Sequence, residues 1–244
     1  MLTRSRYSDA LVTVTSIERS SEGPAPGWDG TGFIVTDGRA GYRLVRAAGA
    51  GPAALGRAAE AYLDDHEQAA CLALGPRARP GRILGRIAAK EAVRDWLVAA
   101  GRRRPAPRWF RIGNDGAGRP RAEVAGGFGP RVSLAHHGTT AVAIAGGGAV
   151  GIDVEAVASR GTVFARLALT GPELALGSGH DPDEWVTRLW TIKEAVAKAA
   201  GTGLRGRPKD IVVREVDGDW AFAEGRWVHS AREGDLVVST VTER

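Results

Sequence analysis

Residues 132–155, VSLAHHGTTAVAIAGGGAVGIDVE, contain three short runs in which apolar residues recur at alternate positions. The runs cover residues 132–135, 141–145 and 150–155, and glycine-rich turns separate them. A period of two is typical of strands that bury one face, and glycine permits the backbone angles that tight turns need. The pattern therefore predicts an antiparallel meander in the middle of the chain.

A helix is predicted further along, over residues 181–200. Its apolar side chains recur at spacings of three and four, and they are Trp185, Leu189, Ile192 and Val196. Pro182 stands near the start and Gly201 just after the end, which are favoured positions for these two residues. Short alternating strands then return over residues 211–241.

The residues before the meander show a similar mixture. Strands are predicted at 11–17, 32–36 and 42–46, helices at 53–74 and 82–100, and a hairpin from 109–112 and 121–124. The chain is therefore predicted to be α+β, with small antiparallel sheets and a long helix in each of two halves. The glycines at 146–148 place the boundary between residues 1–147 and 148–244.

Composition excludes several classes of protein. The 244 residues are 43% hydrophobic and 25% charged, which excludes disorder and collagen. Cys71 is the single cysteine, so neither an intramolecular disulfide nor a cysteine-based zinc site is possible. No apolar block suggests a signal peptide or a membrane helix, and we expect a cytoplasmic location. The net charge of +5 indicates an anionic partner: nucleic acid, a membrane surface, a phosphorylated small molecule or an acidic protein.

Two carboxylates stand close together in the last strand of the meander. Asp153 and Glu155 are two residues apart, so a strand projects both from the same face. Like charges at this spacing raise each other's pKa unless a cation lies between them, and hard oxygen ligands suit magnesium. The alternative is a solvated strand face, which is the commoner explanation of an isolated D-x-E.

Charged residues also share one face of the predicted helix 181–200. Trp190, Glu194 and Lys198 follow at intervals of four, and Lys193 lies beside them. An ordinary surface Glu–Lys pair would explain the charges alone, but the large aromatic ring suggests that this face is partly covered.

Adjacent histidines, His136 and His137, end the first strand of the meander. Neighbouring strand residues point to opposite faces, so these two are not expected to bind one metal ion together. One is a candidate phosphate contact, and a structural role is the alternative for either of them.

Four motifs together resemble the Sfp-type 4'-phosphopantetheinyl transferases. They are Gly118-Arg119-Pro120, Ser133 to His136, G-I-D-V-E at 151–155 and W-x-x-K-E-A-x-x-K at 190–198, in the order of that family. Residues 84–92 are similar to its basic coenzyme-binding helix, and the likeness covers residues 60–215. It implies two α+β halves related by a pseudo-twofold axis, with coenzyme A in the cleft between them.

The resemblance implies a transferase that moves 4'-phosphopantetheine from coenzyme A to a serine of an acyl, peptidyl or aryl carrier protein. Adenosine 3',5'-bisphosphate would be released. By the same resemblance, Asp153, Glu155 and Glu194 hold magnesium on the diphosphate. Glu194 would help to deprotonate the serine, directly or through a metal-bound water, and Lys198 would stabilise or protonate the leaving group.

The resemblance also assigns the coenzyme A contacts. Arg86, Lys90 and His136 would bind the 3'-phosphate, and Lys193 and Lys198 would contact the remaining phosphates. Arg119 occupies the place of the family's usual lysine, which keeps the charge but alters the geometry. The family commonly has Ser-His-Ser where this chain has Ala135-His136-His137, so two hydroxyl donors are missing.

By the same resemblance, the carrier protein would dock on residues 157–179, which include Arg160, Phe164, Arg166 and Leu167. Carriers are acidic, so a basic, partly apolar surface is a fitting complement. A plain amphipathic helix packed on the core is the alternative for this segment. We expect a monomer that binds neither nucleic acid nor membrane. Two rivals stay open: a basic nucleic-acid-binding protein that uses residues 102–104, and a non-catalytic homologue that binds coenzyme A or a carrier. The pathway of the carrier, whether fatty-acid, polyketide, nonribosomal-peptide or siderophore synthesis, also stays open.

Overall fold

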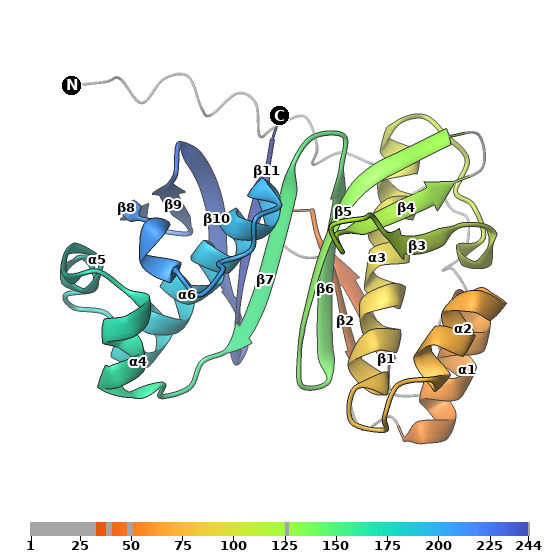
Figure 1. Cartoon of the computed structure of the whole chain (residues 1–244), viewed down its shortest axis with the longest axis horizontal. Helices are drawn as coiled ribbons and strands as arrows, with labels where there is room; N and C mark the ends of the chain where they lie inside the picture. The colour runs from red at the N-terminus through yellow and green to blue at the C-terminus, as the bar shows by residue number, and fades with distance from the viewer. Residues whose placement is uncertain (1–32, 38–40, 48–50, 125–126, 244) are drawn as a thin grey trace. The chain divides into compact units, whose positions relative to one another are not determined.

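The computed structural model describes residues 33–37, 41–47, 51–124 and 127–243, which all belong to one compact unit of residues 31–244. The strand predicted at 11–17 lies outside the described residues. Within this unit the fold is α+β, as predicted, and it contains two antiparallel sheets (Figure 1).

In the described part of the chain, the first sheet has six strands in the order β1-β2-β6-β5-β4-β3. Its strands are β1 (Phe33–Asp37), β2 (Arg43–Ala47), β3 (Arg111–Asn114), β4 (Pro120–Val124), β5 (Gly127–His137) and β6 (Thr140–Gly146). Its helices are α1 (Pro52–Tyr62), α2 (Asp65–Leu72), α3 (Arg79–Ala99) and the short 3-10 helix η3 (Pro107–Trp109). The long helix α3 packs on β2, β5 and β6. The strand pair predicted at 32–36 and 42–46 is confirmed, with Phe33 opposite Ala47.

The second sheet, as far as the described residues show, has five strands in the order β7-β11-β10-β9-β8. Its strands are β7 (Val150–Ala156), β8 (Val213–Asp217), β9 (Trp220–Ala223), β10 (Arg226–Glu233) and β11 (Leu236–Thr242). Its helices are α4 (Gly161–Ala168), α5 (Gly171–Leu176), α6 (Pro182–Ala200) and the 3-10 helix η4 (Pro208–Asp210). The long helix α6 packs on β7 and β11.

Helix α6 confirms the prediction for residues 181–200. The Asp181 carboxylate accepts hydrogen bonds from the backbone N–H groups of Asp183 and Glu184, which caps the first turn. Gly201 ends the helix with φ of 69°, a left-handed conformation that glycine adopts without steric cost. Local capping chemistry therefore sets both ends of this helix.

Two predictions need correction. The helix predicted over 53–74 is broken into α1 and α2, because Asp64 caps α2 in a capping box with Glu67. The predicted three-stranded meander is also wrong, since β5 pairs with β6 but β7 pairs with β11 of the second sheet. The two sheets instead pack face to face through apolar side chains, among them Leu44, Val142, Ile152 and Val238. The sheet therefore changes between β6 and β7, where we still propose the boundary between residues 1–147 and 148–244.

A glycine allows α6 to lie directly against β7. A Cβ atom on Gly151 would stand 1.9 Å from the backbone oxygen of Ala195 and 2.8 Å from the backbone nitrogen of Ala199. Only a residue without a side chain fits at this distance, so Gly151 sets the spacing between the strand and the helix that carry the acidic residues. Among the described residues, no helix is both long enough and apolar enough to cross a membrane.

Candidate active site between β7 and α6

Asp153 and Lys198 join β7 to α6. The Lys198 ammonium donates to Asp153 Oδ1 at 2.7 Å and to the backbone oxygen of Ile152 at 3.1 Å. Asp153 alternates along β7 with Ile152 and Val154, which pack into the core between the sheets. The acidic face of the strand is thus turned away from that core.

The second oxygen of the Asp153 carboxylate is buried and has no hydrogen-bond partner in the described part of the chain. Burial is the main reason that the pKa of Asp153 rises to about 6. Lys198 counteracts the rise, while the charges of Glu194 and Glu155 add to it. A buried acceptor with no donor, in a group of like charges, is an environment that a cation would stabilise.

Glu194 lies one turn before Lys198 on α6. Burial raises its pKa, the Lys198 charge lowers it, and the Glu155 charge raises it further. Glu155 is bonded through Oε2 to Arg160 at 3.0 Å and to His137 at 2.9 Å. The three predicted carboxylates therefore influence one another electrostatically.

These carboxylates are candidate magnesium ligands by their chemistry. They offer hard oxygen donors from two elements, and one donor oxygen of Asp153 is unpaired, which fits Mg²⁺. Lys198 and Arg160 already neutralise part of their charge. Within the described ranges no three His, Cys, Asp or Glu side chains are gathered closely enough to hold an ion, so the structure does not present a closed ligand set.

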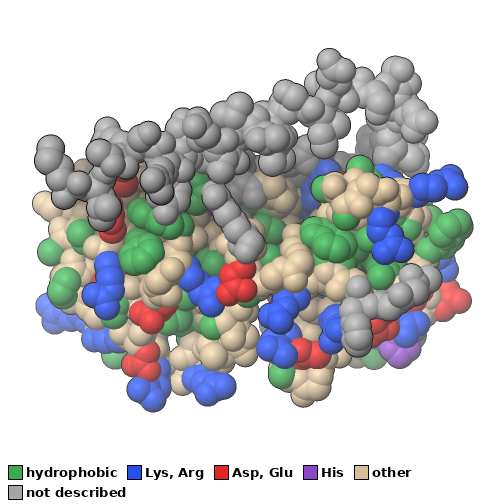
Figure 2. All heavy atoms as spheres, turned by 90° about the horizontal axis from the view of Figure 1, so that it is seen from above, with side chains coloured by type: hydrophobic (Ala, Val, Ile, Leu, Met, Phe, Trp, Pro, Cys, Tyr) green, Lys and Arg blue, Asp and Glu red, His purple; other side chains and the backbone are tan. Residues whose placement is uncertain are grey.

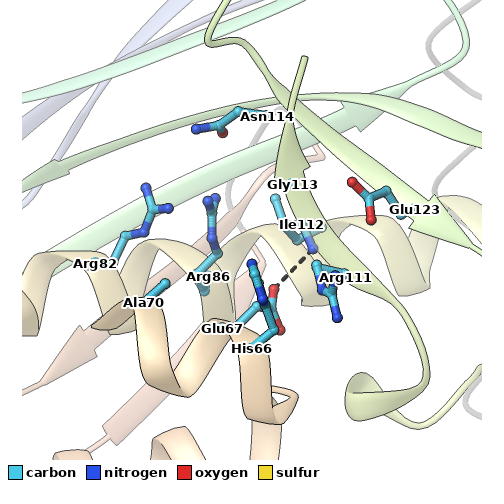
Figure 3. A pocket seen from close by; sticks show the side chains of 10 residues that line it. All are labelled: His66, Glu67, Ala70, Arg82, Arg86, Arg111, Ile112, Gly113, Asn114 and Glu123. Carbon is cyan, nitrogen blue, oxygen red and sulfur yellow. Dashed lines mark hydrogen bonds between the residues drawn. The ribbon is translucent and has the colours of Figure 1, made fainter. Parts of the chain in front are cut away.

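A basic cavity of about 300 Å³ lies in the first half, between α2, α3, β3 and β4. It is lined by His66, Glu67, Ala70, Arg82, Arg86, Arg111, Ile112, Gly113, Asn114 and Glu123. Figure 3 shows Arg82 and Arg86 rising from α3 side by side towards Asn114. Burial, followed by the Arg82 charge, lowers the pKa of Arg86 to about 10, so its guanidinium remains charged near neutral pH. Two neighbouring arginines in one cavity make it a candidate anion site.

Arg86, a predicted site residue, is thus in this cavity, whereas its neighbours there were missed. Arg82 could have been found from the sequence, because it lies four residues before Arg86 on the same helix face. His66 and Arg111 come from other elements, and no local pattern connects them with Arg86.

The two adjacent histidines point to different partners. The His136 ring lies against Gly81 at the start of α3, where a Cβ atom would stand 2.4 Å from ring carbon Cδ2. His136 therefore packs against α3 at the residue before Arg82, while His137 is bonded to Glu155. Their opposite directions are those expected of adjacent strand residues.

The side chain of Arg119, which belongs to the turn between β3 and β4, lies beside the C-terminal end of α6. It is paired with Asp115 at 2.7 Å, and its Nη1 atom is 2.7 Å from the position of a Cβ atom on Gly201. The turn between β3 and β4 therefore brings a cation from the first half to the helix that carries Lys198.

Two predicted phosphate contacts, Lys90 and Lys193, require correction. The Lys90 ammonium is fully buried, pairs with Glu67 at 2.6 Å and donates to the backbone oxygen of Phe110 at 2.7 Å. Lys193 is also fully buried and pairs with Glu173 at 2.8 Å. A buried ammonium already surrounded by acceptors does not reach a phosphate, so we remove both lysines from the candidate site.

The predicted docking segment forms α4 and α5. Arg160 is engaged with Glu155, and the Phe164 ring packs edge-on against Trp190 with centroids 5.2 Å apart. Both side chains are thus already engaged within the unit, whereas Arg166 of the same predicted segment is exposed. The exposed apolar residues of these helices are Val163, Leu167, Leu174 and Leu176.

Charge is interspersed on the face drawn in Figure 2, where Lys and Arg side chains alternate with Asp and Glu. Arg104, from the predicted nucleic-acid-binding run, is paired with Glu91 and Asp95. The basic composition is therefore partly used in internal ion pairs.

Comparison with known families adds to this geometry. Residues 149–231 match the family model described as the 4'-phosphopantetheinyl transferase superfamily. No curated protein matches the chain. The matched segment contains β7, α4, α5 and α6, and so it holds Asp153, Glu155, Glu194 and Lys198. This match supports phosphopantetheine transfer as the general class of activity.

Proposed function

We propose that the chain is an Sfp-type enzyme that transfers 4'-phosphopantetheine from coenzyme A to a serine of an apo carrier protein, with Mg²⁺. The observation that carries the proposal is the unpaired, buried oxygen of Asp153 beside two further carboxylates and a lysine, inside the segment that matches the family. Carriers of the acyl, peptidyl and aryl kinds are all candidate substrates.

The proposed chemistry is an in-line displacement at phosphorus. The serine oxygen forms a bond to the β-phosphorus of coenzyme A, and the bond from that phosphorus to the bridging oxygen breaks, which releases adenosine 3',5'-bisphosphate. Asp153, Glu155 and Glu194 would hold Mg²⁺, which when bound would offset the negative charge that develops on the diphosphate.

Proton transfer is assigned to residues of α6. Glu194 would accept the proton of the serine hydroxyl, and its raised pKa makes it a better base than an ordinary glutamate. Lys198 holds Asp153 in place and would donate to the leaving phosphate, where a cation offsets the developing charge.

The anionic end of coenzyme A is assigned to the basic cavity. Arg82 and Arg86 would bind the 3'-phosphate. His136 of β5, whose ring lies against Gly81 near the start of α3, would be a further contact. Arg119 would contact the diphosphate from the end of α6. In this assignment the 3'-phosphate lies in the first half, and the diphosphate lies beside α6 of the second half.

Intact-protein mass spectrometry tests the proposed reaction. Purified protein, Mg²⁺ and coenzyme A are incubated with a panel of apo acyl, peptidyl and aryl carriers, and each carrier is weighed. We expect one phosphopantetheine on one serine, and we expect its loss with Asp153→Ala. Arg226→Ala, which breaks a surface pair with Glu243, is the matched control and should retain transfer. No mass gain with any carrier, or undiminished transfer by Asp153→Ala, would overturn the proposal.

The assignment of the cavity has its own test. Arg86→Ala should raise the KM for coenzyme A about ten-fold or more, because a charge-assisted contact to the 3'-phosphate is lost. The KM for 3'-dephospho-coenzyme A should be the same for the variant and the wild type. An equal loss with both substrates would show that Arg86 does not bind the 3'-phosphate.

A further inference from the structure

One oxygen of Glu155 is held by two side chains from different parts of the unit. Arg160 comes from the residue before α4, and His137 comes from the end of β5 in the first sheet. Arg160 Nη2 is 3.0 Å and His137 Nδ1 is 2.9 Å from the same atom, Glu155 Oε2. One oxygen of the carboxylate is thus held by side chains from two different parts of the unit.

We propose that His137 and Arg160 are positioning residues for the metal ligand Glu155. By occupying Oε2, they leave Oε1 as the oxygen for the cation and hold the long side chain in one rotamer. This inference rests on the proposed function, because it concerns the same Mg²⁺ site. It goes further in giving roles to two residues whose contact with Glu155 no sequence motif indicates.

The Arg160 side chain is held in place by a further contact, which an ordinary exposed ion pair does not need. Its guanidinium lies over the Phe164 ring, 5.4 Å from the centroid, and Phe164 packs against Trp190. Trp190 is one turn before Glu194 on α6. A continuous set of contacts therefore runs from Glu155 through Arg160 to the helix that supplies the third carboxylate.

His137 reaches Glu155 across the junction between the two sheets. It ends β5 opposite Thr140 of β6, and Gly138 continues the turn with φ of 54°. The resembling family commonly has a serine at this place, and an imidazole extends further than a hydroxymethyl group. Its side chain is 41% exposed, so its removal opens no cavity in the core.

The physical reason for two such donors is the repulsion within the site. Glu155 lies near Asp153 and Glu194, and the charges of the three oppose their close approach. Groups that hydrogen-bond a metal-ligating carboxylate orient it, and their loss commonly weakens metal binding by about 10–100-fold. The same range is expected here.

Isothermal titration of the full chain with MgCl₂, without coenzyme A or carrier, measures this effect directly. His137→Ala and Arg160→Ala should each weaken Mg²⁺ binding about ten-fold or more. His137→Gln should recover part of the loss, because its amide still donates to the carboxylate. Arg226→Ala again serves as the control for removal of an arginine–glutamate pair.

A double-mutant cycle separates positioning from a general structural effect. In a Glu155→Ala background, His137→Ala should cause no further loss of Mg²⁺ affinity, since its partner is already absent. A further loss in that background would overturn the inference, as would single variants that bind Mg²⁺ within about two-fold of the wild type.

The outcomes distinguish the two proposals. A wild type that binds Mg²⁺ and transfers phosphopantetheine, with unchanged affinity in His137→Ala and Arg160→Ala, would overturn this inference alone. A wild type that neither binds Mg²⁺ nor modifies any carrier would overturn the proposed function and this inference with it.

Discussion

The two sheets of the unit carry the same order of elements. In the first half β2 is followed by α1, α2, α3, η3 and four strands, and in the second half β7 is followed by α4, α5, α6, η4 and four strands. Strand orders β2-β6-β5-β4-β3 and β7-β11-β10-β9-β8 also correspond, with β1 as the one addition among the described strands. One frame is therefore used twice, but only the second copy carries the candidate active site.

Both copies contain the same buried ion pair. A glutamate in the capping box of the short middle helix pairs with a lysine of the long helix, Glu67 with Lys90 and Glu173 with Lys193. Each glutamate also accepts the backbone N–H at or next to the start of the following strand, from Ile112 and Val213 respectively. Each pair thus ties two helices to a strand, which is a structural task that both halves need.

Charges differ where the long helix meets the first strand. In the second half the acid is on the strand and the base on the helix, Asp153 with Lys198. In the first half the order is reversed, since Arg43 on β2 pairs with Asp95 on α3. The frame therefore tolerates either polarity, and the acidic strand of the second copy is what offers carboxylate oxygens to a cation there.

The largest effect is expected when the glutamate that follows each buried lysine is replaced by alanine. Glu194→Ala should reduce phosphopantetheine transfer about 10⁴-fold, because a proposed base and metal ligand are both lost. Glu91→Ala should keep transfer within about three-fold, since Glu91 pairs with Arg94 and Arg104 and has no proposed part in the reaction. Rates from intact-mass time courses measure both, and equal losses would show that the halves do not differ in function.

The buried lysines should behave alike in the two halves. Lys90→Met and Lys193→Met should each lower the free energy of unfolding by about 3–5 kcal/mol, because a buried glutamate loses its partner. Urea denaturation gives the values. If Lys193→Met abolished transfer while its unfolding curve matched the wild type, Lys193 would belong to the active site after all.

The long helix packs more closely against its sheet in the second half than in the first, and two glycine substitutions test this difference. Gly151→Ala should cost about 3 kcal/mol, since its Cβ would strike the backbone of α6 and push Glu194 away from Asp153. Gly85→Ala should stabilise the protein by about 0.5–1 kcal/mol, because its Cβ would make an ordinary 3.4 Å contact with Leu134 inside helix α3. Thermal melting of both variants checks the contrast, and a stable Gly151→Ala variant would contradict it.

The smallest expected effect is a pH dependence of the stability that the second buried pair, Glu173 with Lys193, contributes. Burial alone would raise the pKa of Glu173, but hydrogen bonds from Lys193, Thr170 and Val213 outweigh it and lower the pKa below its ordinary 4.5. A lowered pKa in the folded state means stability that is present above about pH 4.5 and lost as the pH falls through the folded value.

Denaturation of wild type and Glu173→Gln across this pH range measures the effect. The difference between their free energies of unfolding should narrow as the pH falls, while exposed Glu215→Gln should follow the wild type throughout. A difference that stays constant with pH would show that the Glu173 carboxylate does not titrate in this way.

Part of the candidate site followed from local patterns. Asp153 and Glu155 alternate with buried Ile152 and Val154, and Glu194 and Lys198 are one helical turn apart, so their common faces were predictable. The role of Lys193 was not, because the sequence shows only that a lysine precedes Glu194. Its burial depends on Glu173, which lies 20 residues earlier.

Two similar halves were expected from the mixture of predicted elements and from the family resemblance, but not from repeated residues. The identical run Lys-Glu-Ala-Val occurs at 90–93 and 193–196, but four residues are too few to indicate a repeat by themselves. The repeat is visible in the order of elements, which tolerates almost complete change of side chains as long as buried positions stay apolar.

The sequence by itself determined the α+β class, most of the strands and the ends of α6, because periodicity and capping act between residues that are close along the chain. Tertiary structure alone decided that β7 joins the second sheet, that Lys90 and Lys193 are buried, and that His137 and Arg160 meet at Glu155. These features depend on contacts between distant segments, whose energies come from burial and from pairing that no local pattern encodes.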